Sequence, residues 1–450
     1  MKNRTGILST AAALVSTLTL AVAGCSSSTF SGSKTAIDYW MWDANQLPGY
    51  QQCAQDFMKE NDDIDIRITQ VGWDDYWTKL TAGFVADAGP DVFTDHVARY
   101  PEFQERGVLL PLDDVGPLKD LNPQEFMTGL ADMWIGQDGK RYGVPKDYDT
   151  VAIMYDKNVL RDAGISEEEL QNANWNPDDG GSFGKIIRHL TVDKNGKRGD
   201  EDGFDKTKIQ TYGLAADPTL DYVGQTSWSP FALSTGWTHT DVPVWGTKFQ
   251  YDDPRFQKTM QWYAGLTKEG ILPAYGEFGE AFPAEQQLGA HRAALAIAGS
   301  WMINWYDRLK DIDLGIAPLP SGPSGHPATM YNGLGDSISK QTKNPREAAR
   351  WVAYLGSDKC QNVIGRQGIV FPARPAGTQE AVKAFHDRGI DVTPFTDRVE
   401  RKETSRYPLT VSGAALFAKA RPYFDAVWIG SKDPSTFTEM NQQMNRILKR

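Results

Sequence analysis

AIDYWMW at residues 36–42, IDIRI at 64–68 and GPDVF at 89–93 are the stretches that decide the fold. In the second stretch, isoleucines alternate with Asp65 and Arg67, and this period of two is typical of a β-strand. We expect a helix between each pair of strands, at residues 50–60 and 75–86. The alternation of strand and helix predicts an α/β fold built on a largely parallel sheet.

The N-terminus has the layout of a secretory signal. The first four residues carry two positive charges, and an uncharged, mainly apolar run follows at residues 7–23. This run is short for a membrane-spanning helix, which needs about 20 mostly apolar residues. It ends in VAGC at residues 22–25, which resembles a bacterial lipobox. We expect residues 1–24 to be removed and the sulfur of Cys25 to receive a diacylglyceryl group; the alternative is an ordinary signal peptide with an incidental cysteine.

Composition limits the partners of the chain. Its 450 residues carry a formal net charge of −11, which disfavours binding to nucleic acid or to an anionic membrane surface. No later segment is apolar enough to span a membrane. A lipid on Cys25, followed by a flexible tether at residues 25–35, would therefore hold the chain to the outer face of the bacterial cytoplasmic membrane. The length allows two or more domains, and we expect a monomer.

Cys53 and Cys360 are the two cysteines besides Cys25. An extracytoplasmic compartment permits a disulfide between them. Buried, reduced thiols are the alternative, and the spacing of the two residues does not decide between these states.

Motifs of enzymes are absent or out of context. The sequence contains no His-Glu-x-x-His zinc motif, no phosphate-binding loop and no Gly-x-Gly-x-x-Gly. GGSFG at residues 180–184 fits the letters Gly-x-Ser-x-Gly, but a polar loop precedes Ser182 where a nucleophile elbow needs an apolar strand. With 58 acidic residues, a carboxylate pair of a secreted glycoside hydrolase stays open as the enzyme alternative.

An acidic loop at residues 193–205 offers closely spaced oxygen atoms, which calcium favours. It lacks the twelve-residue EF-hand arrangement, so a solvated surface loop is the alternative. We expect no cofactor apart from a structural calcium ion in this loop. Its candidate ligands are Asp193, Asn195, Asp200, Asp202 and Asp205.

Several segments, in their order and spacing, resemble one known family. These segments are GPDVF at residues 89–93, GVLLPLDD at 107–114, DGKRYGVP at 138–145, the run from 293 to 301, and GIVFPAR at 368–374. They are similar to segments of the extracellular sugar-binding proteins of ATP-binding-cassette importers, the solute-binding family that includes maltose-binding protein. The likeness extends over nearly the whole chain after the signal.

The resemblance implies an α/β fold of two lobes, joined by a hinge, with the ligand in a cleft between them. Crossings between the lobes are then expected near residues 145–150, 315–320 and 365–371. The expected boundaries are 36–146 with 318–366 for the first lobe, and 147–317 with 367–450 for the second. A ligand that contacts both lobes would favour the closed arrangement.

Candidate ligand-binding residues follow from the chemistry of a sugar. A pyranose has an apolar C–H face that an aromatic ring can cover and hydroxyls that Asp, Asn and Arg can bind. The chain has 14 tryptophans and 17 tyrosines. Trp301, after a buried strand and a Gly-Ser turn, matches the stacking position of the family. The other candidates are Trp42, Asp43, Trp73, Trp77, Asp95, Tyr148, Asp149, Trp228, Trp245, Asn332, Gly333 and Arg374. A role in the core or the hinge is the alternative for each, and Arg374 could instead brace the lobes through a carboxylate.

The resemblance thus implies a lipid-anchored, extracytoplasmic protein that captures a carbohydrate, most simply an oligosaccharide, and delivers it to the permease subunits of an ATP-binding-cassette importer. It implies no catalysis. The alternatives are the secreted glycoside hydrolase and a binding protein for a peptide or polyol. A peptide ligand would need charged anchors for both of its termini, and the sequence does not show them clearly.

Overall fold

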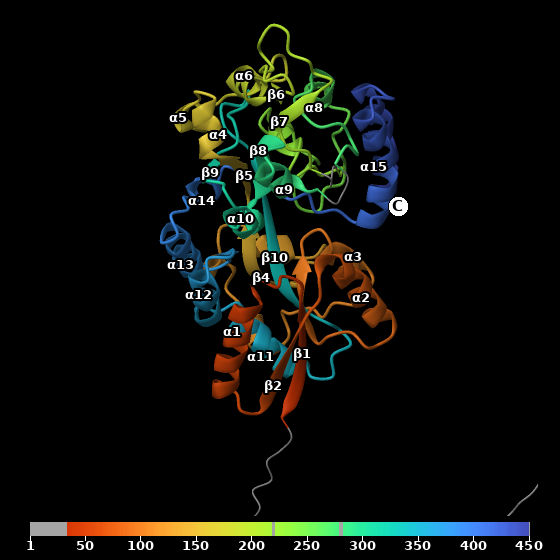
Figure 1. Cartoon of the computed structure of the whole chain (residues 1–450). Coiled ribbons are helices and arrows are strands. Elements are labelled where there is room, and N and C mark those ends of the chain that lie inside the picture. The colour runs from red at the N-terminus through yellow and green to blue at the C-terminus, as the bar shows by residue number, and fades with distance from the viewer. Residues whose placement is uncertain (1–33, 218–220, 279–281, 450) are drawn as a thin grey trace, which may run out of the picture.

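Two β-sheets, each with its own helices and hydrophobic core, make up the computed structural model, which describes residues 34–217, 221–278 and 282–449. We call the body around the first sheet lobe 1 and the body around the second sheet lobe 2. Lobe 1 is the lower body in Figure 1. The expected two-lobed α/β fold is confirmed. The signal and Cys25 lie outside the described residues. Among the described helices, none is both long and apolar enough to cross a membrane.

The N-terminal alternation of strand and helix is confirmed. Its elements are β1 (Thr35–Met41), α1 (Leu47–Glu60), β2 (Ile64–Gln70), α2 (Trp73–Val85) and β3 (Val92–His96). β1 pairs in parallel with both β2 and β3, as the pattern predicted. α1 begins three residues before the expected start, since Pro48 lies in its first turn, where the missing N–H of proline costs no hydrogen bond.

The first sheet has the order β11-β4-β10-β3-β1-β2, with β12 on β10. The other elements of lobe 1, with 3-10 helices marked η, are α3 (Tyr100–Glu105), η1 (Gly116–Asp120), η2 (Pro123–Glu125), η3 (Ala131–Trp134), β4 (Val144–Asp149), β10 (Thr329–Ile338), α11 (Pro345–Leu355), α12 (Asp358–Arg366), β11 (Phe371–Pro372), α13 (Pro375–His386), α14 (Thr393–Glu400) and β12 (Thr404–Arg406).

The second sheet has the order β6-β7-β8-β5-β9. The elements of lobe 2 are β5 (Val151–Asp156), α4 (Lys157–Asp162), α5 (Glu167–Gln171), α6 (Gly181–Leu190), β6 (Val192–Asp193), β7 (Ile209–Leu214), α7 (Ser229–Leu233), α8 (Pro254–Glu269), α9 (Ala284–Gly289), β8 (Ala293–Gly299), η4 (Ser300–Met302), α10 (Ile303–Asp307), β9 (Leu314–Ala317), α15 (Gly413–Trp428), η5 (Pro434–Thr436) and α16 (Phe437–Leu448).

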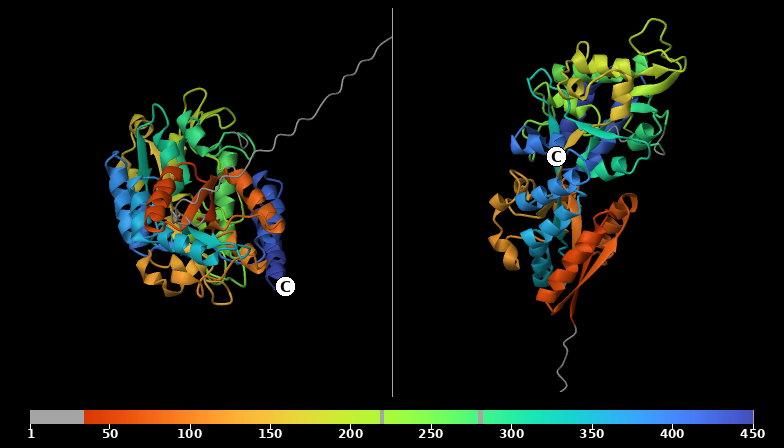
Figure 2. Two further views of the ribbon diagram at one scale, coloured as in Figure 1. Left: turned by 90° about the horizontal axis from the view of Figure 1, so that it is seen from below. Right: turned by 60° about the vertical axis from the view of Figure 1, so that its left-hand side comes forward.

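The chain changes lobe three times, and Figure 2 shows the two bodies joined at a narrow waist. Thr150 alone separates β4 from β5, at the end of the expected first crossing. The second change falls between β9 and β10, and the boundary expected after residue 317 coincides with the end of β9, which pairs with β5. The third change falls between β12 and α15, later than the boundary expected after residue 366, because β11 pairs with β4 and β12 pairs with β10. The boundary expected after residue 146 falls three residues before β4 ends at Asp149.

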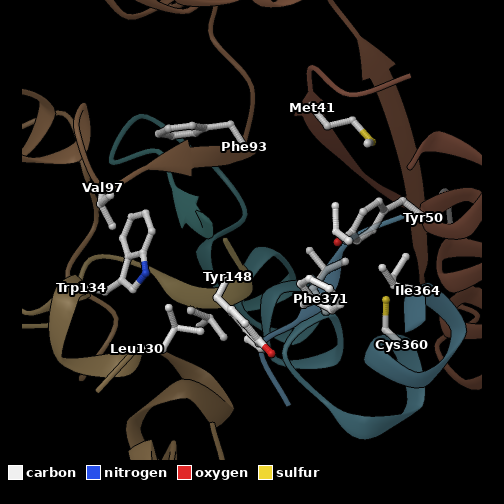
Figure 3. Packing of buried hydrophobic residues seen from close by; sticks show 14 of the residues in the cluster. Met41, Tyr50, Phe93, Val97, Leu130, Trp134, Tyr148, Cys360, Ile364 and Phe371 are labelled. Atoms are coloured by element: carbon white, nitrogen blue, oxygen red, sulfur yellow. The ribbon is translucent and has the colours of Figure 1, made fainter. Parts of the chain in front are cut away.

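The two cysteines in the described residues are paired in the core of lobe 1. Cys53 on α1 and Cys360 on α12 form a disulfide, and neither residue has exposed surface. Figure 3 shows Cys360 beside Ile364 in the hydrophobic packing near Tyr50. The bond closes a loop with a sequence separation of 307 residues and ties the first helix of the chain to α12.

Candidate ligand-binding site

Three of the predicted tryptophans meet at the end of β1. The ring centroid of Trp42, which directly follows β1, lies 5.1 Å from that of Trp73 and 5.3 Å from that of Trp77. Trp73 and Trp77 occupy positions i and i+4 of α2 and therefore share one face of the helix. The hydroxyl of Tyr76 donates to the carbonyl of Thr94 at 2.8 Å and so fixes α2 against β3. We call Trp42, Trp73 and Trp77 the aromatic cluster; the side chain of Trp73 is 46% exposed.

Asp43 is half-buried in the turn that leads from β1 into α1. Its carboxylate accepts hydrogen bonds from the backbone N–H of Asn45 at 2.8 Å and from Nε2 of Gln46 at 3.0 Å. These local bonds hold the carboxylate beside Trp42. Two predicted candidates, one aromatic and one acidic, thus lie together at the open end of the first strand.

The crossing from β4 to β5 carries a second group of polar side chains. Oδ1 of Asp149 accepts a hydrogen bond from the hydroxyl of Ser300 at 2.6 Å, and the backbone N–H of Ser300 donates to the carbonyl of Thr150 at 3.0 Å. Burial raises the pKa of Asp149 to about 7, with the hydrogen bond from Ser300 acting against the rise and the charge of Asp43 adding to it. The charge of Asp43 therefore contributes to the raised pKa of Asp149.

Trp301 follows Ser300 directly, so the same contacts set its position. Its half-buried indole lies against the backbone of Gly299, where an added Cβ would come within 2.0 Å of the ring. Only glycine at this strand end leaves room for the ring. The hydrogen bond between Ser300 and Asp149 thus joins the residue before Trp301 in lobe 2 to β4 of lobe 1.

A pocket in lobe 2, beyond the end of β7, was missed by sequence reasoning. Aromatic side chains from α8, the segment after it and α15 line this pocket, together with polar residues. The lining includes Tyr263, Tyr275, Phe278, Trp428, Asp217, Thr267, Gln287 and Arg421. The amide of Gln287 bonds both the N–H and the carbonyl of Ala216 and so fixes the segment that enters the pocket. These residues are far apart in sequence, and no local pattern marks them as neighbours.

Two predicted ligand contacts are core residues, which corrects the prediction. Trp228 has no exposed surface, and its ring stacks on Phe424 at 5.7 Å and meets Phe256 at 5.2 Å. Tyr148 is also fully buried and stacks on Phe371 at 5.6 Å. The alternation of strand β4 explains the second correction, because Tyr148 points to the opposite face from Asp149.

Asp95 is also corrected to a structural role. Asp95 lies near the end of β3, which runs between β1 and β10, and its carboxyl group is fully buried. This group accepts hydrogen bonds from the backbone N–H of His96 at 2.8 Å and the hydroxyl of Ser337 at 3.3 Å. Burial raises the pKa of Asp95 to about 8.

This raised pKa predicts how stability depends on pH. The folded state holds the proton of Asp95 up to about pH 8, whereas the unfolded chain releases it near the ordinary Asp pKa of 3.8, so the contribution of Asp95 to stability is lost as pH rises through about 8. We expect the free energy of unfolding to fall between pH 5 and pH 9 by more than about 1 kcal/mol further in the wild type than in Asp95→Asn. Urea unfolding at both pH values measures this, and identical pH dependence in the two proteins would contradict it.

Arg374 pairs with a carboxylate, as in the alternative for this residue, but the partners found for it lie within lobe 1 and not in the other lobe. Its guanidinium pairs with Glu125, donates from Nε to the carbonyl of Gly356 at 2.7 Å, and lies 4.7 Å over the ring of Phe126. With these partners, it is corrected from a ligand contact to a structural cation.

Asn332 and Gly333 are buried within β10 and do not reach the open end of β1 directly. Nδ2 of Asn332 lies 3.1 Å from Nε2 of His96, whose ring meets that of Trp73 at 6.0 Å. A side chain at Gly333 would collide with Leu130. Asn332 therefore orients a neighbour of the aromatic cluster, and both residues are corrected to supporting roles.

Trp245 connects the two lobes. Its indole N–H donates to the carbonyl of Ile135 at 2.8 Å, and its half-buried ring meets that of Tyr100 at 5.9 Å. The backbone of Trp245 has a φ of 57°, a conformation that is strained for a bulky residue. The predicted contact with ligand stays a prediction, while its packing is against lobe 1.

The acidic loop does not gather its oxygen atoms. The carboxylate of Asp193 accepts from the backbone N–H groups of Asn195, Lys197 and Asp205, and Asp200 bonds His189. In the described part of the chain, no three His, Cys, Asp or Glu side chains are placed to hold a metal ion. The calcium site, including Asp202, stays a prediction without support from this geometry.

Comparison with known proteins places the chain in a family. Residues 52–384 match the model of bacterial extracellular solute-binding proteins. The arabinooligosaccharide-binding protein of Bacillus subtilis is 26% identical over 369 residues, which are 78% of each chain. The maltodextrin-binding protein MdxE of the same species is 24% identical over 327 residues, 72% of this chain and 70% of the relative.

Solved structures share the fold. The substrate-binding protein Lmo0181 from Listeria monocytogenes, in complex with cycloalternan, superposes with a TM-score of 0.76 at 17% identity, covering 93% of this chain and all of that one. The GacH receptor of Streptomyces glaucescens superposes with a TM-score of 0.73 at 20% identity, covering 93% and 99%. The family match over most of the chain and this common two-lobed fold lead to one conclusion: the chain belongs to the family of bacterial extracellular solute-binding proteins.

Proposed function

We propose that this protein captures a carbohydrate, most simply an oligosaccharide, and delivers it to the permease of an ATP-binding-cassette importer. The names of two relatives, an arabinooligosaccharide-binding and a maltodextrin-binding protein, support this ligand class. The family consists of binding proteins, which favours capture over turnover.

The observation that carries the proposal is the chemistry of the junction between the lobes. The aromatic cluster contributes an indole that is 46% exposed, and Trp301 contributes a second indole from the other lobe. Asp43 directly follows Trp42, and Asp149 accepts a hydrogen bond from Ser300, the residue before Trp301. Aromatic rings suit the apolar faces of sugars, and carboxylates accept strong hydrogen bonds from hydroxyls. Rings on both lobes suit a ligand with more than one sugar unit.

Thr150, the single residue between β4 and β5, is a short connection between the lobes, and this supports capture of the ligand by closure of the two lobes. Thr150 is tied to lobe 2 by Ser300 and to α14 through its hydroxyl, which donates to the carbonyl of Phe395 at 2.8 Å. A sugar that contacts Asp43 in lobe 1 and Trp301 in lobe 2 would favour the arrangement in which both are close.

Location completes the proposal. The family is extracellular. We further propose that the protein is anchored through a lipid on Cys25, on the basis of VAGC at residues 22–25 and the serine-rich segment after it. Labelling with a radioactive fatty acid tests this anchor: the wild type should incorporate the label and Cys25→Ala should not.

A thermal-shift screen of residues 34–450 against mono- and oligosaccharides tests the proposed ligand class. A ligand that binds only the folded state raises Tm as its concentration rises. We expect one group of related carbohydrates to do so. Shifts from peptides or polyols alone would contradict the proposal.

Trp301→Ala should weaken the affinity for the carbohydrate found in the screen about 10- to 100-fold, because it removes the ring that covers one sugar face. Tm without ligand should change little, since the ring is half-exposed. Trp301→Phe keeps an aromatic face and is the matched control, with most of the affinity retained. Equal affinity of the wild type and Trp301→Ala in calorimetric titration would remove Trp301 from the site.

A further inference from the structure

The pocket beyond the end of β7 is walled mainly by rings and aliphatic groups. Tyr263 of α8, Trp428 of α15 and Phe278, which lies between α8 and α9, supply the rings, and Leu272 lies beside them. The rings of Tyr263 and Trp428 meet edge to face, with their centroids 5.7 Å apart. The lining includes neither the aromatic cluster nor Trp301. The pocket is therefore a feature of lobe 2 that shares none of these proposed carbohydrate contacts.

The size of the pocket matches one flat ring. The volume of its cavity is about 120 Å³. An apolar cavity of about 150 Å³ in another protein binds benzene, so a cavity of this size holds a six-membered aromatic ring and little more. A pyranose has a puckered ring with hydroxyl groups around its edge, and it is bulkier than benzene. The cavity volume therefore favours an aromatic ring over a sugar unit.

Two polar side chains of the lining already bond other parts of the protein. The buried amide of Gln287 bonds the backbone through both its oxygen and its nitrogen. The carboxylate of Asp217 accepts a hydrogen bond from the hydroxyl of Thr226. A buried sugar would need a partner for each of its hydroxyls. These two side chains are less available for that purpose than their chemistry alone indicates.

Two further polar side chains of the lining share one carboxylate. The hydroxyl of Tyr275 donates to Oδ1 of Asp425 at 3.0 Å, and Nε of Arg421 lies 3.6 Å from the other oxygen of Asp425. The side chain of Arg421 is 56% exposed, and its guanidinium lies 5.8 Å over the ring of Phe417. Asp425 thus ties the segment after α8 to α15 and holds two walls of the pocket together.

One donor in the wall has no partner. Nε1 of Trp428 is buried, and no described residue accepts its hydrogen. Five other buried indole N–H groups also lack a described acceptor, but of the described tryptophans Trp428 alone lines the pocket. The hydroxyls of Tyr263 and Thr267 complete the polar lining. An indole nitrogen only donates, so the matching group on a ligand is an oxygen acceptor.

We propose that this pocket is a second binding site, which takes a single aromatic ring that carries an oxygen acceptor. The ring lies against Tyr263 and Phe278, and the oxygen accepts from the N–H of Trp428. Such a ring belongs either to a free small molecule, such as phenol or acetophenone, or to the aglycone of an aryl glycoside. This inference goes beyond the proposed function, because capture of a carbohydrate at the junction does not require the pocket.

Ligand-observed NMR titration of residues 34–450 with phenol and acetophenone tests the proposal. Cyclohexanol is the matched control, since it has the hydroxyl and the ring size of phenol without the flat aromatic ring. We expect at least one of the two aromatic compounds to bind saturably with a Kd of about 1 mM or lower, and cyclohexanol to bind at least about 10-fold more weakly. Absence of saturable binding by both aromatic compounds, or equal binding of cyclohexanol, would overturn the proposal.

Paired glycosides identify the source of the ring. The pairs are phenyl and methyl α-D-glucopyranoside, and phenyl and methyl α-L-arabinofuranoside. Tighter binding of a phenyl glycoside than of its methyl counterpart, by about 10-fold or more, would assign the pocket to an aglycone. Equal binding within both pairs, with phenol or acetophenone still bound, would assign it to a free aromatic molecule.

Variants assign the binding to the pocket. Trp428→Phe keeps a ring but removes the N–H, and it should weaken acetophenone binding about 3- to 10-fold. Ala274→Phe fills the cavity from an exposed position of its lining and should abolish binding, with little risk to folding. Trp351→Phe is the matched control, because Trp351 is buried in lobe 1 with an equally unpartnered N–H and should leave the affinity unchanged. Wild-type affinity in both pocket variants would place the site elsewhere and refute the proposal.

Discussion

Trp228→Ala should lower the free energy of unfolding by about 3–5 kcal/mol, the cost of removing a large aromatic side chain from a packed core. Trp228 has no exposed surface and contacts the rings of Trp237, Phe256 and Phe424 in lobe 2. The surrounding rings come from three separate segments, so the space that its loss leaves cannot be refilled by one side-chain rotation. Urea unfolding measures the loss.

Trp305→Ala is the matched control for this experiment. Trp305 is the same residue type on α10, but its side chain is 50% exposed, so its loss should change stability by no more than about 0.5 kcal/mol. If Trp228→Ala instead kept its stability and lost affinity for the carbohydrate, Trp228 would be a ligand contact and its position in the core would be wrong.

The double variant Cys53→Ser/Cys360→Ser should lose about 3–5 kcal/mol of stability, because the disulfide closes a very long loop and restricts the unfolded chain. The sequence separation of 307 residues means that the bond joins two ends of lobe 1 that flank the whole of β5 to β9. Both cysteines are buried, Cys53 on α1 and Cys360 on α12, so the bond lies inside the core of lobe 1.

Reduction provides an independent arm of the same test. Wild-type protein unfolded in urea with dithiothreitol should show the stability of the double variant, and dithiothreitol should not change the double variant further. Equal stability of the wild type with and without reductant would mean that the two cysteines are not paired.

Local patterns in the sequence predicted what depends on neighbours along the chain. The alternating isoleucines of β2 and the Gly-Pro turn before β3 identify their elements without tertiary information. The spacing of Trp73 and Trp77 likewise places both rings on one face of a helix. The first crossing was predicted from the resemblance to the family. Trp42, Trp73 and Trp77 were predicted as separate candidates, and their meeting at the end of β1 was not predicted.

What the sequence could not predict is set by contacts between distant segments. Trp228 lies in a polar stretch rich in Gly and Ser, which favours an exposed loop, yet α8 and α15 cover it. Arg374 has the side chain of a hydroxyl-binding residue, and only its neighbour Glu125 reveals a structural role. The hydrogen bonds of the Lys146 ammonium to Tyr39 and Thr94 also depend on tertiary contacts, which no local pattern records.

Isothermal titration calorimetry of residues 34–450 with oligosaccharides, short peptides and polyols, followed by analysis of each sugar for cleavage, is the most direct measurement of what the protein captures. We predict saturable binding of one carbohydrate per chain, no comparable heat from peptides or polyols, and recovery of the sugar intact. Saturable binding of a peptide or polyol with none from any carbohydrate, or release of hydrolysis products from the sugar, would contradict carbohydrate capture.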